Sequence, residues 1–204
     1  MSRNLDPKGK IVRRFGMNVF GNEKYQKILD KRPNPPGPQK QHRGRLSEYG
    51  KQLMEKQKLR FAYGLTERQF RNTFDKAKKM KGVTGENLLS LLERRLDNVV
   101  YSLGIAKSRA QARQIVNHAH IRVNDKKVNI PSYVVSVGDK ITAASNEAAK
   151  KFLQTLVADN ASRTLPEWLE FSKVDLTGLV KRLPEKHDIA VIADESLVVE
   201  LYSK

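Results

Sequence analysis

The sequence of 204 residues contains no cysteine. This absence excludes a disulfide framework, a thiolate zinc site, an iron–sulfur cluster and a cysteine nucleophile. No apolar run approaches the ~20 residues that a membrane helix needs, and the N-terminus lacks the apolar core of a secretory signal. We therefore expect a cytoplasmic protein with no membrane partner.

Acidic residues are also scarce. They number 22 against 39 basic residues, which gives a formal net charge of +17. The excess is uneven, because residues 1–45, 46–98 and 99–150 carry +9, +5 and +5, whereas residues 151–204 carry −2. Such an asymmetry attracts a polyanion to one part of a molecule. A basic surface kept for solubility is the less favoured reading, and no isolated basic amphipathic helix suggests membrane binding. Nucleic acid is the favoured partner.

The first 45 residues do not have the pattern of a compact domain. Gly9, Gly16 and Gly21 interrupt them, and residues 33–38 contain four prolines. Proline fixes φ and removes a backbone donor, so this composition is typical of loops. We predict an extended basic N-terminal arm over residues 1–45 that becomes ordered on RNA.

Helical spacing begins at Leu46. Ser47 is a predicted cap for the first helix, and Thr66 begins a capping box for a helix to about Met80. A strongly apolar helix is predicted from Leu88 to Leu103, after Gly82 and Gly85 and before Gly104. One face of the second helix is predicted to be core rather than a base-stacking surface, and its residues are Phe70, Phe74 and Ala77.

The period then changes from helix to strand. Ser108 is predicted to cap a helix, and alternating apolar residues on both sides of residues 124–127 predict a β-hairpin. Further strands are predicted at 133–137, 140–143, 179–183 and 189–192, and a helix from Asn146 to about Ala158. Propensity alone leaves residues 194–202 open between helix and strand.

Four segments of this region resemble a small RNA-binding module, the one named after small ribosomal subunit protein four. They are residues 107–114, 118–124, 131–133 and 137–139. Many proteins share that module, so the module alone indicates only RNA binding. Segments outside it identify the family. Residues 45–50, 67–71, 84–89, 95–101 and 197–203 are similar to signatures of the family of small ribosomal subunit protein four itself, and the likeness covers nearly the whole chain.

The resemblance implies an α+β fold of defined organisation. A mostly helical rRNA-binding domain over residues 46–98 would be completed by residues 194–204, which would form a helix. An α+β domain over residues 99–193, with a small antiparallel sheet, would be inserted between these parts. It would contain the RNA-binding module at about residues 95–155.

Three features depart from the family pattern. Some members hold zinc with four cysteines in the N-terminal arm, and without cysteine no metal is expected here. Ala119 stands where many members have a residue such as glycine at a helix end. Asp125 replaces the common glycine of the hairpin, which predicts slight strain in a left-handed turn.

The resemblance also implies a structural protein of the small ribosomal subunit, not an enzyme and without a cofactor. It would bind the 5′ domain of small-subunit rRNA early in assembly, contact small-subunit protein five near the channel where mRNA enters, and support translational accuracy. Some members repress their own message, which leaves mRNA open as a further partner. No small-molecule substrate is expected.

The candidate RNA-binding residues are basic or polar side chains on the predicted helices and hairpin. They are Arg43, Arg45, Lys51, Lys58, Arg68, Arg71, Lys78, Lys79, Lys107, Ser108, Arg109, Arg113, Arg122, Asn124 and Lys126. The acidic last quarter is predicted to face protein or solvent. Candidate residues for the contact with protein five are Lys173, Asp175, Glu200 and Tyr202.

Two other functions fit the sequence less well. An enzyme that carries the module, such as a pseudouridine synthase or tRNA synthetase, needs a catalytic domain, but no Gly-rich phosphate loop or buried carboxylate pair is present. A free-standing module of the heat-shock type would lack the helical portion over residues 46–98. His118 and His120 have no third ligand at suitable spacing, so a phosphate contact or a solvated surface is favoured over a metal site.

Overall fold

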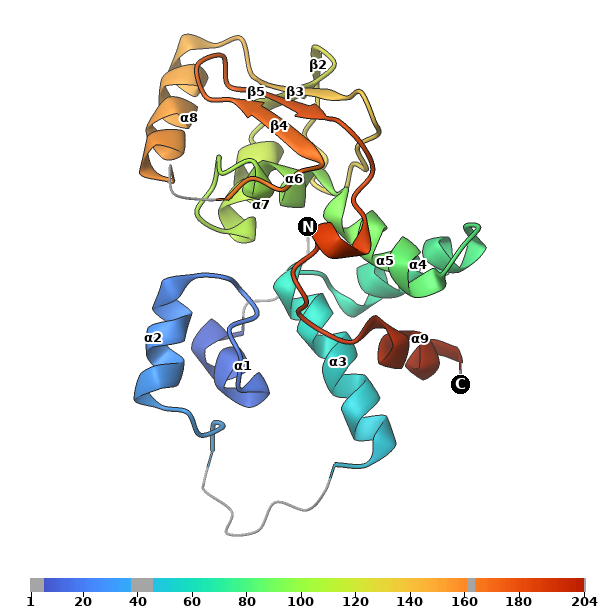
Figure 1. The fold of residues 1–204 in the computed structure, drawn as a ribbon. Coiled ribbons are helices and arrows are strands. Elements are labelled where there is room, and N and C mark those ends of the chain that lie inside the picture. The colour runs from blue at the N-terminus through green and yellow to red at the C-terminus, as the bar shows by residue number, and fades with distance from the viewer. Residues whose placement is uncertain (1–5, 38–45, 161–163, 204) are drawn as a thin grey trace. The chain divides into compact units, whose positions relative to one another are not determined.

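The computed structural model describes residues 6–37, 46–160 and 164–203 (Figure 1). The chain separates into two compact units. Unit 1 comprises residues 1–88 and 191–204, and unit 2 comprises residues 89–190. Unit 1 is helical, whereas unit 2 combines helices with a small antiparallel sheet. The predicted α+β class is confirmed.

The helices of unit 1 are α1 (Lys8–Phe15), α2 (Glu23–Lys31), α3 (Glu48–Ala62), α4 (Glu67–Lys79) and α9 (Glu195–Ser203). Helix α5 (Thr84–Glu93) continues into unit 2. Unit 2 contains α6 (Leu96–Ser102), α7 (Arg109–Asn117), α8 (Glu147–Asp159) and the short 3-10 helix η1 (Lys186–Asp188). Its strands are β1 (Ile121–Val123), β2 (Lys126–Lys127), β3 (Lys140–Ala143), β4 (Leu169–Ser172) and β5 (Thr177–Val180).

The prediction of an extended arm is wrong for residues 6–37, which contain α1 and α2. Helix α1 buries Ile11 and Val12, with Phe15 partly buried one turn on, and α2 buries Leu29, with Tyr25 partly buried one turn before it. Pro7 directly precedes α1, where a missing N–H breaks no helical hydrogen bond, and Gly16 ends that helix with φ of 67°. Pro7 and Gly16 therefore mark helix boundaries, whereas Gly9 lies within α1. The rest of the predicted arm, residues 1–5 and 38–45, lies outside the described residues.

Helices α3 and α4 begin at the predicted caps. The Ser47 hydroxyl accepts the N–H of Gly50 at 3.2 Å, and Thr66 forms the complete capping box with Gln69. The predicted core face of α4 is confirmed, because Phe70 and Phe74 are buried. Each cap satisfies N–H groups at a helix start, which explains why these boundaries could be predicted.

The last residues of the chain return to unit 1. Helix α9 packs against α3 and buries Val198 completely. Gly85, which was expected to break a helix, lies inside the first turn of α5. A Cβ atom there would lie only 2.7 Å from Cγ of Glu195, so this glycine permits the close approach of α9.

The single helix predicted from Leu88 to Leu103 is wrong, because the chain forms α5 and α6 with a break at Arg94 and Arg95. At this break the N–H of Leu96 donates to the carbonyl of Tyr133 at 2.8 Å, outside the helical pattern. The segment that follows the hairpin therefore supplies hydrogen bonds that would otherwise come from a continuous helix.

The sheet of unit 2 has the antiparallel order β2-β1-β3-β5-β4. One face covers a core around the fully buried Trp168, and Figure 1 shows α6 and α7 on one side of the sheet. The predicted strand at 133–137 is wrong, because this segment pairs with residues 94–96 through an isolated bridge and single hydrogen bonds. The strand predicted at 179–183 is observed as β5 at Thr177–Val180, and residues 189–192 form no strand.

Candidate nucleic-acid interface

Helix α4 brings four of the predicted RNA-binding residues to one side. Its core face turns Phe70 and Phe74 inward, and the exposed cations project from roughly the opposite side. These are Arg68, Arg71, Lys78 and Lys79. Within the described part of the chain none of them forms an ion pair, although one exposed carboxylate, Asp75, lies on the same side. This α4 cation face keeps its charges available for an anionic ligand.

The two predicted lysines of α3 are engaged with neighbouring carboxylates. Nζ of Lys51 lies 2.7 Å from Glu48, and Nζ of Lys58 lies 2.6 Å from Glu55. Glu55 also accepts the N–H of Asp194 at 3.0 Å and so helps to hold the segment before α9. The remaining predictions for this region, Arg43 and Arg45, lie outside the described residues.

The predicted residues around α7 differ in their exposure. Ser108 caps α7 by accepting the N–H of Gln111 at 3.3 Å. Lys107 is exposed and forms an ion pair with Asp159 at 2.8 Å. Arg109 donates to the side-chain oxygen of Asn98 at 2.7 Å, with its guanidinium 4.6 Å above the ring of Tyr101. The structure therefore places Lys107 and Arg109 at the start of α7, both with partners in the protein.

Arg113 belongs to a buried polar network that sequence reasoning missed. Asp97, only 4% exposed, accepts two hydrogen bonds from Arg95 at 3.0 and 2.8 Å and forms an ion pair with Arg113 at 3.5 Å. Asn98 donates to the carboxylate of Glu93 at 2.8 Å. Four charged residues within the apolar segment 88–103, namely Glu93, Arg94, Arg95 and Asp97, were the available signal, because buried charges require partners.

The hairpin turn consists of Asn124 and Asp125, with φ of 50° and 62°. The predicted left-handed conformation of Asp125 is confirmed. The amide of Asn124 donates to Asp139 at 2.8 Å and accepts the N–H of Lys140 at 2.9 Å, so this side chain ties the hairpin to β3. Arg122 is partly exposed and Lys126 is exposed. Of the predicted hairpin residues, these two cations are accessible to solvent, whereas Asn124 has a framework role.

Tyr202 packs inside unit 1. Its ring stacks on Phe74 with centroids 4.6 Å apart, and its hydroxyl donates to Glu67 at 2.9 Å. Burial and this hydrogen bond raise the pKa of Tyr202 above its usual value. Burial alone would raise the pKa of Glu67, but hydrogen bonds from Lys56 and Tyr202 outweigh it and lower that pKa. Tyr202 thus fixes α9 to α4.

The other candidates for a protein contact are exposed. Lys173 and Asp175 lie in the turn between β4 and β5, where Asp175 accepts the hydroxyl of Ser172 at 2.9 Å. Glu200 lies on the exposed side of α9.

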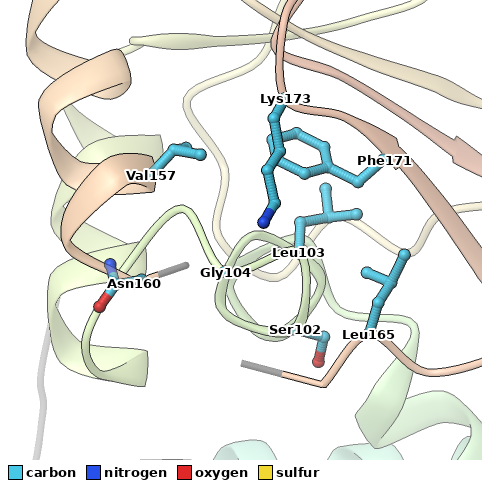
Figure 2. Close-up of a pocket in the computed structure, with 8 residues that line it drawn as sticks. All are labelled: Ser102, Leu103, Gly104, Val157, Asn160, Leu165, Phe171 and Lys173. Carbon is cyan, nitrogen blue, oxygen red and sulfur yellow. The ribbon is translucent and has the colours of Figure 1, made fainter. Parts of the chain in front are cut away.

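A small pocket in unit 2 is lined mainly by apolar side chains, with the side chain of Lys173 reaching into it (Figure 2). Its volume is about 60 Å³, well below the several hundred Å³ of typical ligand sites.

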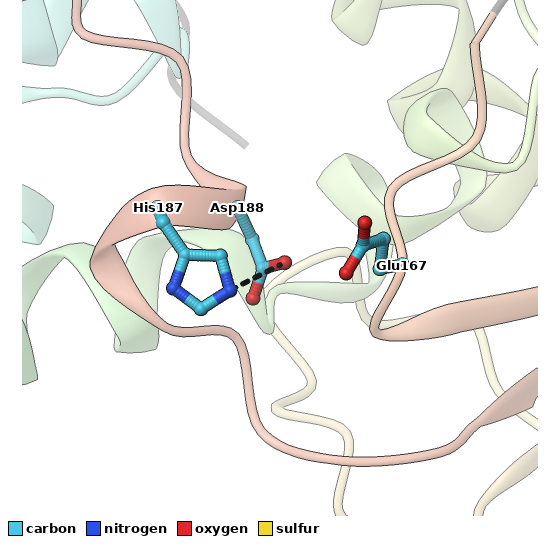
Figure 3. A group of neighbouring side chains, drawn as sticks. All are labelled: Glu167, His187 and Asp188. Carbon is cyan, nitrogen blue, oxygen red and sulfur yellow. Dashed lines mark ion pairs between the residues drawn. The ribbon is translucent and has the colours of Figure 1, made fainter.

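Figure 3 shows Glu167, His187 and Asp188, the one group among the described residues whose side-chain ligand atoms could meet at a metal ion. Arg182 already pairs with both carboxylates of this group, donating to Asp188 at 2.8 Å and lying 3.6 Å from Glu167. Burial alone would raise the pKa of Asp188, but the hydrogen bond from Arg182 outweighs it and lowers that pKa. We interpret the group as an ion network that closes the loop after β5.

Comparison with known proteins agrees with this arrangement. Residues 3–93 match the ribosomal protein S4/S9 N-terminal domain, and residues 94–141 match the S4 domain. Small ribosomal subunit protein uS4 of Borreliella burgdorferi strain ZS7 is 50% identical over 206 residues, which cover 100% of this chain and 99% of the relative. The chain belongs to the uS4 family. The uS4 proteins of Treponema denticola and Caldicellulosiruptor saccharolyticus are each 50% identical, covering 97% and 100% of this chain and 97% and 100% of the relative.

Family membership makes this uS4 protein a structural component of the cytoplasmic ribosome, not an enzyme. The S4 domain implies that it binds rRNA of the small subunit. No helix in the described residues is both long and apolar enough to cross a membrane.

Proposed function

We propose that this uS4 protein binds the 5′ domain of small-subunit rRNA and helps to nucleate assembly of the subunit. The observation that carries the proposal is the α4 cation face, whose members have no ion pair within the described residues. A-form RNA hides its major-groove edges, so a protein that binds folded RNA works through phosphates, 2′-hydroxyls and shape. Cations on a rigid helix supply contacts of this kind.

Unit 2 would supply a second group of RNA contacts. Lys107, Arg109, Arg122 and Lys126 remain direct candidates because each is at least partly exposed. Ser108 would act at the start of α7, whereas Arg113 and Asn124 would position the surface through Asp97 and Asp139. The proposal retains Arg43, Arg45, Lys51 and Lys58 as contacts of unit 1.

The finer functions are also proposals. We assign contact with small-subunit protein five, near the channel where mRNA enters, to the acidic last quarter of the chain. This contact would support translational accuracy. We include mRNA as a further partner in the proposal. Lys173, Asp175 and Glu200 are exposed candidates, and Tyr202 would act by holding α9 in place. The proposed domains are residues 46–98 with 194–204, and residues 99–193. The compact units, 1–88 with 191–204 and 89–190, support a second domain inserted into the first, but they assign residues 89–98 to that second domain.

Filter binding across a salt series tests the rRNA proposal. The full chain would be titrated with a 5′-domain fragment and with an unrelated structured RNA of equal length. Both affinities should fall as salt rises, because phosphate contacts release counterions. A preference of at least ~100-fold for the 5′-domain fragment is expected. Equal affinity for both RNAs would contradict the proposal.

Two matched variants locate the contact. Arg68→Gln with Arg71→Gln removes two unpaired cations of α4, whereas Lys150→Gln removes an exposed lysine already paired with Glu147. The double variant should weaken binding to the 5′-domain fragment at least ~10-fold and reduce the salt slope by about 1–2. Lys150→Gln should change little. If the double variant and Lys150→Gln changed binding equally, the assignment of α4 to the RNA interface would be contradicted.

A further inference from the structure

Unit 2 has a second cationic surface on the sheet face that points away from its core. Ile121, Val123 and Ile141 are buried, so the alternate side chains of β1 and β3 point outward. Arg122 pairs across the sheet with Lys127 on β2 and with Thr142 on β3. The outward sheet face is formed by Arg122, Lys127, Lys140, Thr142, Thr177 and Leu179.

The cations of this face form no ion pair with any residue that the structure describes, in contrast to several other cations of unit 2. Elsewhere in the unit Lys107, Arg113 and Arg182 form ion pairs with carboxylates. Arg122, Lys127 and Lys140 form none within the described residues. Glu170 points to the same side at the far edge of the sheet, but it lies 3.3 Å from Lys181. The face therefore presents uncompensated positive charge.

A row of three aromatic rings adjoins this face. The ring centroids of His118 and His120 are 6.0 Å apart, and those of His120 and Phe152 are 5.6 Å apart. His120 accepts the N–H of Ala144 at 2.8 Å, which continues the pairing of β1 with β3. His120 therefore lies two residues from Arg122 and on the same side of β1.

Phe152 has an exposure that core packing does not explain. It is 44% exposed on α8, whereas the other six phenylalanines, all within the described residues, are buried or partly buried. Leu153 and Val157 already provide the buried contacts of α8. An exposed ring that contacts a second ring beside unpaired cations offers a flat π-surface next to positive charge.

We infer that the outward sheet face and the aromatic row bind an unpaired RNA segment. Bases would stack on His120 and Phe152, and Arg122, Lys127 and Lys140 would contact the phosphates. Single-stranded RNA is bound by this combination of aromatic platforms and a cationic track, and stacking tolerates any base. An acidic protein partner would use the cations but would leave the aromatic row without a role. The inference rests on the proposed RNA-binding function and extends the contact at Arg122 to a site for unpaired RNA.

Binding of the full chain to a ten-nucleotide unpaired RNA and to an equally long duplex RNA tests the inference. Phe152→Leu keeps an apolar side chain but loses the flat ring, and should weaken binding of the unpaired RNA about 10-fold without affecting the duplex. Phe152→Trp keeps a flat ring and should bind the unpaired RNA as tightly as wild type. The stacked base should quench the fluorescence of the new indole. Unchanged binding by Phe152→Leu would overturn the inference, because the exposed side chain can be replaced without unfolding.

The charged part has its own matched control. Lys127→Gln with Lys140→Gln should reduce the salt slope for unpaired RNA by about 1.4. Lys151→Gln removes another exposed lysine without an ion pair, on α8 outside the face, and should have a smaller effect. Equal slopes for the double variant and wild type would also overturn the inference.

The two proposals can fail separately. If the chain does not prefer the 5′-domain fragment but Phe152→Leu still weakens binding of unpaired RNA, the rRNA proposal fails and the sheet site stands. If the preference holds and Phe152→Leu has no effect, the sheet site fails alone.

Discussion

Ala119 adopts a left-handed backbone conformation, with φ of 58°, one residue after the C-cap of α7, His118. This conformation costs an alanine roughly 1–2 kcal/mol, whereas glycine adopts it freely but loses about 0.5–1 kcal/mol more backbone entropy on folding. Ala119→Gly should therefore raise the free energy of unfolding by about 0.5–1 kcal/mol in a urea titration. As a control, Ala110→Gly in the first turn of α7 should lower it. Destabilisation by Ala119→Gly would show that the methyl group contributes more than the strain costs.

Glu67 is the residue at which stability should depend on acidic pH. It accepts hydrogen bonds from Lys56 at 2.7 Å and Tyr202 at 2.9 Å, and its pKa is lowered in the folded protein. A lowered carboxyl pKa stabilises the fold above the unfolded-state pKa, and this contribution is lost as pH falls through the folded-state pKa. Glu67 is 48% exposed, so screening limits the contribution to about 0.5–1 kcal/mol at pH 7.

The measurement compares wild type with Glu67→Gln by urea unfolding at neutral pH and at about pH 2.5. Wild type should be the more stable at neutral pH, and the difference should shrink at the lower pH. A difference of the same size at both values would show that the charge of Glu67 does not contribute.

At the scale of elements, the sequence predicts best where a local signal decides the structure. Ser47, Thr66 and Ser108 satisfy N–H groups within their own helices, so these helix starts could be predicted. The break between α5 and α6 could not, because it depends on the carbonyls of Pro131 and Tyr133, more than 30 residues away.

The candidate site shows the same division. Helical spacing was enough to place the cations of α4 together. Spacing could not reveal that Arg113 faces Asp97, because that contact comes from the packing of α6 against α7. Lys127 and Lys140 were missed although strand alternation places them with Arg122, since their neighbour relations depend on register across the sheet.

The packing of α6 and α7 should depend on Asp97, which lies between the guanidinium groups of Arg95 and Arg113. Asp97→Ala leaves both cations buried without their carboxylate and should cost about 3–5 kcal/mol in the free energy of unfolding. Asp159 is the matched control, because it also lies 2.8 Å from a cation, Lys107, but at the surface. Asp159→Ala should cost less than about 1 kcal/mol in the same urea titration. Similar costs would mean that burial does not decide the strength of these pairs.

At the scale of the whole molecule, the two units differ in which parts of the sequence form them. Unit 1 needs residues from both ends of the sequence, because α9 packs against α3 and places Tyr202 on Phe74. Unit 2 is one continuous segment, and its core surrounds Trp168, the single tryptophan of the protein. The fluorescence of Trp168 therefore reports on unit 2, whereas far-UV circular dichroism reports on both units.

Deletion of residues 195–204 should uncouple these two signals. Without α9, the apolar surface of α3 and the ring of Phe74 lose their cover, so unit 1 should lose helical circular dichroism and melt at a lower temperature. Unit 2 loses none of its own residues, so the emission of Trp168 should keep its buried, blue-shifted maximum and its own thermal transition. Tyr202→Phe keeps the stacked ring and serves as the mild control, with a cost near 1 kcal/mol for the lost hydrogen bond. A simultaneous red shift of Trp168 and loss of helix on deletion would instead show that the units unfold as one cooperative body.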